Sequence, residues 1–354
     1  MTNLSIAAIP GDGVGLEVMP EARRVLDAVA ERHDLILEYT EFDWGAQYYL
    51  KHGRMMPPGG LDQLRSFDAI LLGAVGHPSI PDHTALNGLL LPIRRTFEQW
   101  ACERPARLYR GVRSPIAGKE PGSIDFVIVR ENTEGEYSQV GGRLYALTDD
   151  EVAIQTSIFT RKGVERIIRY AFDLARRRNG KRRVTSITKS NALGFSMALW
   201  DQIFDEVAQD YQDIIADSLL VDAAVMNFVR YPEHFDVVVA SNLFGDILSD
   251  LAAIITGSMG LAPSTNLNPS RTFPSMFEPV HGSAPDIAGK GIVNPLAMIL
   301  SATMMIDFLG KPEAAKEIEK LVEDVLAEGR TIPTDLGGRA STREVTDAIL
   351  RKLR

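Results

Sequence analysis

Short apolar runs alternate with amphipathic stretches along the chain. The run at residues 4–9 ends at Pro10, and apolar positions then recur at helical spacing over residues 18–29. Residues 68–76 and 125–129 each open with aspartate and continue as an apolar run, which is typical of strands covered on both faces. Strands that alternate with helices predict an α/β fold built on parallel sheet.

The same pattern predicts further elements toward the C-terminus. Three buried strands end near residues 129, 188 and 240, and polar or charged residues follow each of them. Because α/β sheets bind ligands beyond the carboxyl ends of their strands, we expect functional residues there. The strands that end near 188 and 240 span residues 184–188 and 236–240, and one further strand is predicted at residues 35–42. The predicted helices lie at residues 163–178, 312–328 and 341–354.

Composition and charge narrow the range of functions. The chain has 354 residues, which suggests two domains or one large α/β domain, and a formal net charge of -9 that disfavours nucleic acid as a ligand. No apolar segment approaches the roughly 18 residues of a membrane-spanning helix. The single cysteine, Cys102, suits a reducing compartment. We therefore expect a cytoplasmic protein with neither nucleic-acid nor membrane partners.

Basic residues cluster around Asn179 and Gly180. Residues 176–178 are three arginines and residues 181–183 are Lys-Arg-Arg, a pattern that targeting signals and nucleic-acid-binding patches share. We favour a structural interpretation, because cations stabilise the C-terminal end of a helix and Asn-Gly commonly ends one.

Gly11, Gly13 and Gly15 lie at the first strand-to-helix junction, where dinucleotide-binding folds have a glycine loop. The fingerprint of such loops is G-x-G-x-x-G, and here the third glycine comes one position early. Asp12 would also set a carboxylate against a pyrophosphate. The spacing predicts a structural tight turn, or a loop that contacts a ligand by another geometry.

Asp246 and Asp250 follow the predicted strand at residues 236–240. At a spacing of four they project from one face of a helix and repel each other unless a cation or a proton lies between them. Carboxylate oxygens suit Mg²⁺ or Mn²⁺. The alternative is a solvated acidic helix end, although the neighbouring residues are apolar.

Basic side chains supply a second group of candidates. Arg94 lies in a predicted helix with the leucines at residues 89–91, Arg104 precedes a proline, and Arg130 ends a buried strand. Arginine binds carboxylates through two parallel N–H groups, so three arginines at one site would recognise a small di- or tricarboxylate. Each arginine taken alone also fits a surface cation.

Lys189 and the segment at residues 278–286 complete the candidates. Lys189 ends another buried strand, where it is either a surface charge or a group for proton transfer. Residues 278–286 are rich in turn formers, yet they include a histidine and two acids, which is more typical of a binding loop than of a linker.

Together these motifs resemble the metal-dependent β-decarboxylating dehydrogenases, a family that includes isopropylmalate, isocitrate, homoisocitrate, tartrate and D-malate dehydrogenases. The resemblance spans nearly the whole chain, and residues 89–95 and 130–142 look most like the tartrate and D-malate branch. Asn87 departs from the branch, since a tryptophan is expected before the glycine of that helix. The matching motifs are residues 9–13, 129–137, 188–191, 242–250 and 278–295.

The resemblance implies an isopropylmalate dehydrogenase-like two-domain α/β fold, which is not a standard Rossmann fold. Residues 1–100 and 256–354 would form a large domain with the cofactor site. Residues 101–255 would form a small domain with the dimer interface and the metal and catalytic residues.

The resemblance also assigns roles to individual residues. Tyr137 and Lys189 would be the catalytic acid and base, and Lys189 would come from the neighbouring subunit of a homodimer with shared active sites. Arg94, Arg104 and Arg130 would bind the substrate carboxylates. Mg²⁺ or Mn²⁺ would be held by Asp246 and Asp250 with Asp222 of the neighbour, and NAD would lie along His281, Gly282, Ser283, Ala284, Asp286 and Asn294.

The expected reaction is oxidation and β-decarboxylation of a small 2-hydroxy diacid, D-malate or tartrate. The leucines at residues 89–91 would place apolar surface near the group on C3, which favours the alternative of a 3-isopropylmalate dehydrogenase of leucine biosynthesis. A non-catalytic or regulatory relative is a further alternative, although all five catalytic and metal positions are intact. The sequence leaves open the physiological diacid, any assembly beyond a dimer and any requirement for a monovalent cation.

Overall fold

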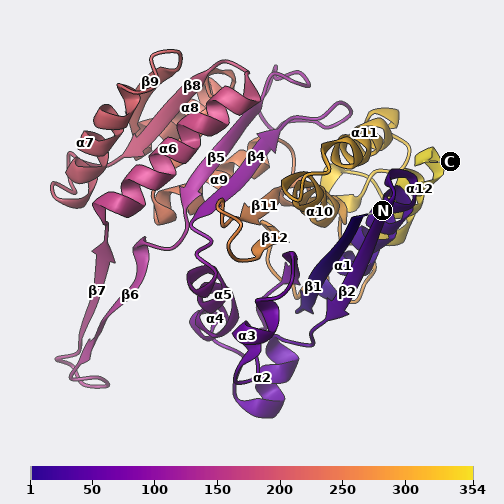
Figure 1. Cartoon of the computed structure of the whole chain (residues 1–354), viewed down its shortest axis with the longest axis horizontal. Coiled ribbons are helices and arrows are strands. Elements are labelled where there is room, and N and C mark those ends of the chain that lie inside the picture. The colour runs from indigo at the N-terminus through magenta and orange to yellow at the C-terminus, as the bar shows by residue number, and fades with distance from the viewer. Residues whose placement is uncertain (1, 354) are drawn as a thin grey trace. The chain divides into compact units, whose positions relative to one another are not determined.

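The computed structural model describes residues 2–353, and the chain divides into two compact units, each with its own sheet (Figure 1). Unit 1 contains the described chain up to Gln99, residues 103–125 and the chain from Ala252 onward. Unit 2 contains residues 100–102 and 126–251.

Residues 103–125, which we expected in the small domain, are grouped with unit 1. The backbone N–H of Glu103 donates to Thr265 Oγ1 at 3.1 Å, and Arg107 and Arg110 both bond to Glu323 of the C-terminal segment. These contacts explain why the segment belongs to unit 1 although the strand that follows belongs to unit 2.

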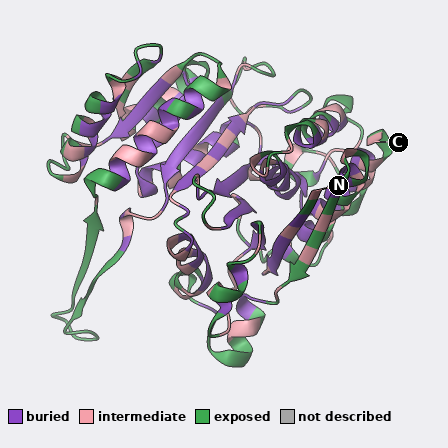
Figure 2. Ribbon diagram, viewed as in Figure 1, coloured by how far each residue is buried: buried purple, intermediate pink, exposed green. Residues whose placement is uncertain are grey.

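Unit 1 is built on a five-stranded sheet in the order β11-β12-β3-β1-β2. Strand β1 (Thr2–Gly11) is parallel to β2 (Leu35–Glu41) and β3 (Ala69–Ala74), and β3 is parallel to β12 (Ser275–Pro279). Edge strand β11 (Pro263–Asn266) is antiparallel to β12. Every residue of β3 is buried, as its continuous apolar run predicts (Figure 2).

Helices cover both faces of this sheet. On one face α10 packs against β12, α1 and α11, and it is buried nearly all round. On the other face, Ile9 and Leu72 of the sheet pack in a core cluster with Trp44, Leu89 and Phe97. The helices of unit 1 are α1 (Gly15–Ala30), α2 (Ala46–His52), α3 (Gly60–Leu64), α4 (Asp82–Ala85), α5 (Leu91–Thr96), α10 (Leu296–Phe308), α11 (Pro312–Glu328) and α12 (Thr342–Leu353).

Unit 2 is built on a second sheet in the order β4-β5-β10-β8-β9, in which β5, β10, β8 and β9 run parallel. Its edge strand β4 begins in unit 2, and its residues from Glu103 onward are grouped with unit 1. Helix α6 lies in front of the sheet and α8 behind it in the view of Figure 1. The strands are β4 (Ala101–Arg107), β5 (Asp125–Glu131), β8 (Arg183–Thr188), β9 (Ile215–Leu220) and β10 (Val237–Ala240). The helices are α6 (Arg161–Arg178), α7 (Ser196–Ala208), α8 (Val221–Arg230) and α9 (Asn242–Ile255).

A two-stranded antiparallel arm, β6 (Gly135–Leu144) and β7 (Val152–Ile158), extends from unit 2 (Figure 1). Every residue of β7 is exposed, and the arm is exposed over most of its length in Figure 2. The sequence pattern did not predict this arm, because neither strand contributes to a core and so neither leaves a buried apolar run.

The basic cluster around Asn179 is structural. Helix α6 begins where Thr160 Oγ1 accepts a bond from Gly163 N–H, and it ends at Asn179, which adopts a left-handed conformation with φ 49°. Arg176 bonds to Asp213 and Arg183 to Asp217. These pairings confirm the interpretation as a helix end.

Among residues 2–353, no helix has both the length and the hydrophobicity needed to cross a bilayer.

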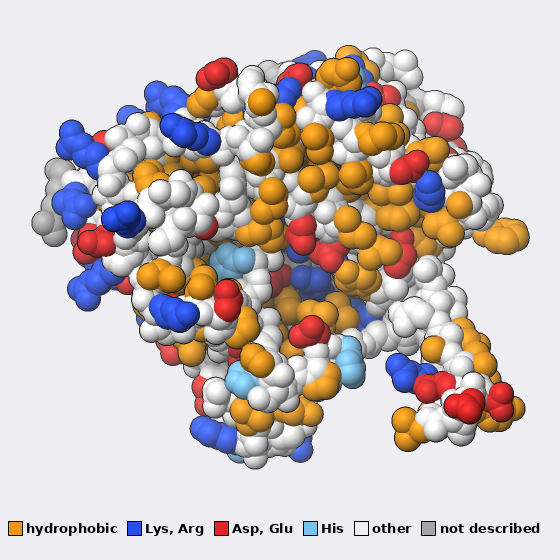
Figure 3. Space-filling view, turned by 180° about the vertical axis from the view of Figure 1, so that it is seen from behind, with side chains coloured by type: hydrophobic (Ala, Val, Ile, Leu, Met, Phe, Trp, Pro, Cys, Tyr) orange, Lys and Arg blue, Asp and Glu red, His pale blue; other side chains and the backbone are white. Residues whose placement is uncertain are grey.

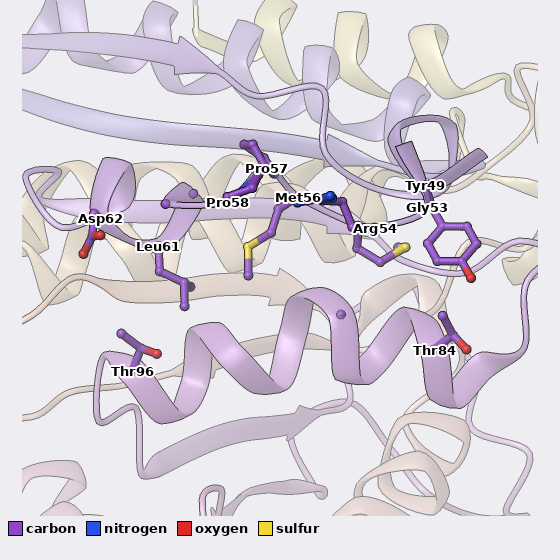
Figure 4. A pocket seen from close by; sticks show the side chains of 14 residues that line it. Tyr49, Gly53, Arg54, Met56, Pro57, Pro58, Leu61, Asp62, Thr84 and Thr96 are labelled. Carbon is purple, nitrogen blue, oxygen red and sulfur yellow. The ribbon is translucent and has the colours of Figure 1, made fainter. Parts of the chain in front are cut away.

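A surface pocket of about 600 Å³ lies in unit 1 between residues 53–62 and the helical segment from α4 to α5 (Figure 4). Met56 and Leu61 line it from one side and Thr84 and Thr96 from the other. None of its described lining residues is among the predicted catalytic, metal or cofactor residues.

The glycine-rich segment between β1 and α1 is a tight turn organised by the buried Asp12. Gly11 and Gly13 have φ 70° and 54°, values that favour glycine. Asp12 accepts bonds from the backbone N–H groups of Ala46 at 2.6 Å and of Gly76 at 2.9 Å, and burial raises the pKa of its carboxyl. The carboxylate that is unsuited to a pyrophosphate therefore ties the turn to α2 and to the end of β3.

Replacing Asp12 by alanine should destabilise unit 1, because two backbone donors lose their acceptor. We expect the free energy of unfolding in urea to fall by about 2 kcal/mol. Asp12→Asn should lose a comparable amount, since its amide N–H would face one of the donors. Asp62→Ala, at an exposed position, is the control, and a loss below about 0.5 kcal/mol for Asp12→Ala would contradict this role.

Candidate active site

The carboxyl end of β5 brings Arg130 against the first turn of α9. Arg130 is 1% exposed, and its Nε and Nη2 donate to Asn242 Oδ1 at 2.9 and 2.7 Å. Its Nη1 donates to Asp246, and Asn242 Nδ2 donates to the backbone oxygen of Glu134 at 2.9 Å. Asn242, which the sequence analysis did not single out, thereby fixes the plane of the guanidinium group.

Tyr137 meets the same aspartate from the beginning of the arm. Its hydroxyl donates to Asp246 Oδ2 at 2.7 Å, and the Arg130 guanidinium lies 5.2 Å from the centre of its ring. The structure therefore brings Asp246 together with Arg130 and Tyr137, which lie 116 and 109 residues earlier in the sequence. Asp250 lies one turn further along α9, as the spacing predicts, and is exposed.

The segment that joins β5 to the arm has its own acidic network. Glu131 is buried, accepts bonds from the backbone N–H groups of Thr133 and Glu134, and pairs with Arg166. Burial raises the pKa of its carboxyl. Glu134 in turn accepts from the hydroxyl and the N–H of Thr160. These residues were missed as site residues. The signal that could have identified them was the cluster of three glutamates, at residues 131, 134 and 136, directly after a buried strand.

Lys189 and Asp222 form an ion pair within the single chain. Lys189 Nζ lies 2.7 Å from Asp222 Oδ1, with side-chain exposures of 29% and 60%. The hydrogen bond from the Lys189 ammonium holds the pKa of Asp222 below its usual value. Both residues lie at carboxyl ends of parallel strands, Lys189 just after β8 and Asp222 at the start of the helix that follows β9.

Arg94 and Arg104 are buried in unit 1. Arg94 Nη2 donates to Glu278 Oε1 at 2.8 Å, while its buried Nε has no partner in the described part of the chain. Arg104 Nε lies 3.4 Å from Ser264 Oγ. Neither arginine is an ordinary surface cation, since burial of an arginine requires partners.

The expectation for the leucines at residues 89–91 needs correction. Leu89 is fully buried and Leu90 is 6% exposed, and both belong to the core cluster of unit 1, while Leu91 is partly exposed. Two of the three side chains therefore pack in the core and offer no apolar surface to a ligand. Asn87, at the start of the π-helical turn Leu86–Leu90, is exposed.

The predicted cofactor loop packs on the turn before α1. Val14 N–H donates to the backbone oxygen of Ser283 at 2.9 Å, and a side chain at Gly13 would collide with that oxygen. Ala284 has φ 39°, a conformation that is costly for a residue with a Cβ. The loop lines a pocket of about 820 Å³ together with residues 75–82.

Further along the loop, Glu17 of α1 accepts bonds from the N–H groups of Gly289 and Gly291 at 2.5 and 2.8 Å. Asn294 is buried and donates to Asp335 at 3.0 Å, and Asp286 is exposed. His281 Nδ1 donates to the backbone oxygen of Gly282 at 3.0 Å, while among residues 2–353 its buried Nε2 has no partner.

Comparison with known proteins gives this arrangement a family. A model of the isocitrate/isopropylmalate dehydrogenase family matches residues 5–349. D-malate dehydrogenase [decarboxylating] of Escherichia coli is 54% identical over 99% of both chains, and tartrate dehydrogenase/decarboxylase of Pseudomonas putida is 53% identical over 97% of this chain and 96% of the other. The chain belongs to the isocitrate/isopropylmalate dehydrogenase family.

Solved structures agree with this assignment. The crystal structure of isocitrate dehydrogenase from Methylococcus capsulatus superposes on this structure with a TM-score of 0.90 at 37% identity, and the match covers 100% of each chain. The TT0538 protein from Thermus thermophilus matches 99% of this chain and 68% of its own with a TM-score of 0.87. The resemblance inferred from the motifs and the predicted fold class are confirmed, and this member of the family is a decarboxylating dehydrogenase.

The part-buried ring of His281 should make this enzyme lose stability on acidification. Burial lowers its pKa from the ordinary 6.5, so the folded state keeps the ring neutral while the unfolded state takes up a proton. The stability that it contributes is present above about pH 6.5 and is lost as the pH falls through the folded pKa.

Thermal unfolding between about pH 7.5 and about pH 5.5 tests this effect, since that window spans the ordinary histidine pKa. The unfolding midpoint of His281→Gln should fall less than that of the unaltered protein, and the exposed His83→Gln should behave like the unaltered protein. Equal falls in all three proteins would contradict the effect.

Proposed function

We propose that this enzyme oxidises and decarboxylates D-malate, and also acts on tartrate, with NAD as oxidant and Mg²⁺ or Mn²⁺ as cofactor. The observation that supports the reaction most strongly is the meeting of a guanidinium, a phenol and a carboxylate at Arg130, Tyr137 and Asp246. The choice of diacid is supported by relatives named for D-malate and tartrate at 51–54% identity over nearly the full chain.

Asp246 and Asp250 fit a hard divalent cation. Carboxylates one turn apart on α9 repel each other, and a cation would relieve that repulsion. Within residues 2–353 of one chain, no three His, Cys, Asp or Glu side chains come together in a way that could hold a metal. The proposal therefore takes the third carboxylate, Asp222, from a second subunit.

NAD would bind along residues 281–286 and at Asn294. The loop fits such a ligand because its Ser283 and Ala284 border a pocket and because its buried His281 Nε2 has no partner among the residues that the structure describes. The exposed carboxylate of Asp286 could accept bonds from ribose hydroxyls and would repel the 2′-phosphate of NADP.

The side chains of the enzyme would divide the remaining chemistry among them. When bound, NAD accepts the hydride from C2 and the divalent cation polarises the substrate oxygens at C1 and C2. Arg94, Arg104 and Arg130 would hold the two carboxylates, Lys189 would accept the proton of the C2 hydroxyl, and Tyr137 would donate a proton to C3 after CO₂ has left.

A homodimer with shared sites would complete this arrangement. Helix α8, whose first turn contains Asp222, exposes Val225, Met226 and Val229, and α9 exposes Ile247 and Ile254. Apolar side chains are also exposed on the arm, which projects at the lower right in Figure 3. Exposed apolar surface on the helices that bear the proposed metal ligands supports an interface there.

Initial rates of NAD reduction with Mn²⁺ and a panel of D-malate, tartrate and 3-isopropylmalate test the reaction. We expect higher kcat/KM for D-malate and tartrate than for 3-isopropylmalate, and for NAD than for NADP. A clear preference for 3-isopropylmalate would assign the enzyme to the leucine-biosynthetic branch, and no turnover of any diacid would contradict catalysis.

Metal dependence should run through the aspartates of α9. Asp250→Asn removes an anionic ligand and relieves like-charge repulsion, so activity should fall by about two orders of magnitude while the thermal unfolding midpoint is retained. Asp205→Asn, at an exposed position of α7, is the control. Full activity of Asp250→Asn protein in trace metal would refute the assignment.

Shared sites predict complementation between two inactive variants. In a hybrid of Lys189→Ala and Tyr137→Phe subunits, one of the two sites receives both intact groups, so an equal mixture should regain about a quarter of full activity. The measurement is the rate after subunit exchange, verified by mass spectrometry with one variant isotopically labelled. Absence of recovery in verified hybrids would count against shared sites.

A further inference from the structure

Glu136 directly precedes Tyr137 on β6. Its carboxylate contacts the beginning of α9, the helix that contains Asp246. Its Oε1 accepts a bond from Ser241 Oγ at 2.8 Å, and its Oε2 accepts from Leu243 N–H at 3.1 Å. Ser241 directly precedes α9, and Leu243 is its second residue. The carboxylate of β6 therefore binds the N-terminus of α9.

Helix α9 draws this stabilisation from another element because its own first turn provides none. It has no acidic residue in that turn, and the side chain of Asn242 is engaged by Arg130 and by the backbone oxygen of Glu134. A negative charge at a helix N-terminus is favourable, and its oxygens satisfy N–H groups that lack partners within the helix.

The path of β6 allows two adjacent side chains to contact the same helix. In a regular strand, residues 136 and 137 point to opposite faces. Here the pairing register of the arm shifts between Gly135 and Val140, and Gly135 has φ 77°. Glu136 can therefore bind the start of α9 while Tyr137 bonds to Asp246 one turn later.

We propose that Glu136 is a positioning residue, which holds the first turn of α9 so that Asp246 lies within hydrogen-bond distance of Tyr137. This inference rests on the roles given to Tyr137 and Asp246 in the proposed function. Glu136 bonds to Ser241 and Leu243 at the beginning of the helix, and so its effect passes through the placement of the helix. Asp246 belongs to the next turn, which makes its carboxylate sensitive to movement at the N-terminus.

The consequence should be specific to metal affinity and to the second half of the reaction. Displacement of Asp246 would loosen one proposed metal ligand and part it from Tyr137, the proposed proton donor at C3. Oxidation at C2 would continue, while CO₂ loss and protonation would lag. More of the 2-oxo diacid would then leave the enzyme before it is decarboxylated.

Three variants of the intact homodimer separate positioning from simple stabilisation. Glu136→Ala removes both acceptor oxygens. Glu136→Gln keeps one oxygen for Leu243 N–H and can donate to Ser241 Oγ. The matched control is Glu206→Ala in α7, because Glu206, like Glu136, accepts two hydrogen bonds, here from the side chains of Arg161 at 2.6 Å and Gln202 at 2.7 Å.

The first measurement is Mn²⁺ affinity without substrate, from the electron paramagnetic resonance signal of free Mn²⁺. We expect the Kd to rise about tenfold in Glu136→Ala, as for other residues that orient metal ligands, and to change little in Glu136→Gln and Glu206→Ala. The second is the fraction of turnovers of D-malate that release oxaloacetate. It should rise severalfold in Glu136→Ala alone, and as a ratio it does not depend on how much enzyme is folded.

Equal Mn²⁺ affinity and equal oxaloacetate release in Glu136→Ala and Glu206→Ala would overturn the proposal. If Glu136→Ala does not fold, Ser241→Ala removes one of the two donors and should change both quantities in the same direction, and no change would overturn it. Unaltered enzyme that turns over no diacid would overturn the proposed function and leave the Mn²⁺ affinities to decide the role of Glu136. Unaltered protein that binds no Mn²⁺ would overturn both.

Discussion

The carboxylate of Asp246 joins three elements of unit 2, and the arrangement around it depends on this contact. It accepts bonds from Arg130 at the end of β5 and from Tyr137 at the start of the arm, and it belongs to α9. A buried guanidinium that loses its anionic partner costs several kcal/mol. The end of β5, the beginning of the arm and α9 are therefore held together by one requirement, which is the neutralisation of the Arg130 charge.

The parallel strands could be predicted from the sequence because burial on both faces leaves an uninterrupted apolar run, as in β3 and β5. Strand β9 could not, since it lies at the sheet edge with no residue fully buried. The arm escaped prediction for the same reason, and its bend at Gly135 depends on contacts with α9 that no local pattern encodes. Elements whose stability comes from neighbouring strands leave little trace in periodicity.

The candidate site divides in a similar way. Asp246 and Asp250 follow from a spacing of four on a helix, and Arg130 from its place at a strand end. The error over Leu89 and Leu90 arises because helical leucines have the same pattern whether they face a core or a ligand. Glu136 was missed because an acid in an irregular strand has no periodic signature, and its partner Leu243 lies 107 residues away.

The two predicted binding regions are built from different chemistry. In unit 1 the predicted cofactor loop is held through its own backbone groups: the Ser283 oxygen accepts from Val14 N–H, and the N–H groups of Gly289 and Gly291 donate to the Glu17 carboxylate. In unit 2 the proposed catalytic cluster is held through side chains, with the Asn242 amide and the Asp246 carboxylate fixing Arg130. Substitutions in the loop should act mainly through conformation, because Gly289 and Gly291 have φ 77° and 65°, values that favour glycine. Substitutions in the cluster act through charge, since each removed partner leaves another buried or half-buried group to be satisfied. Neutral substitutions of similar shape are therefore informative in unit 2, where shape is retained and charge is lost, and say little about a loop whose geometry is set by its main chain.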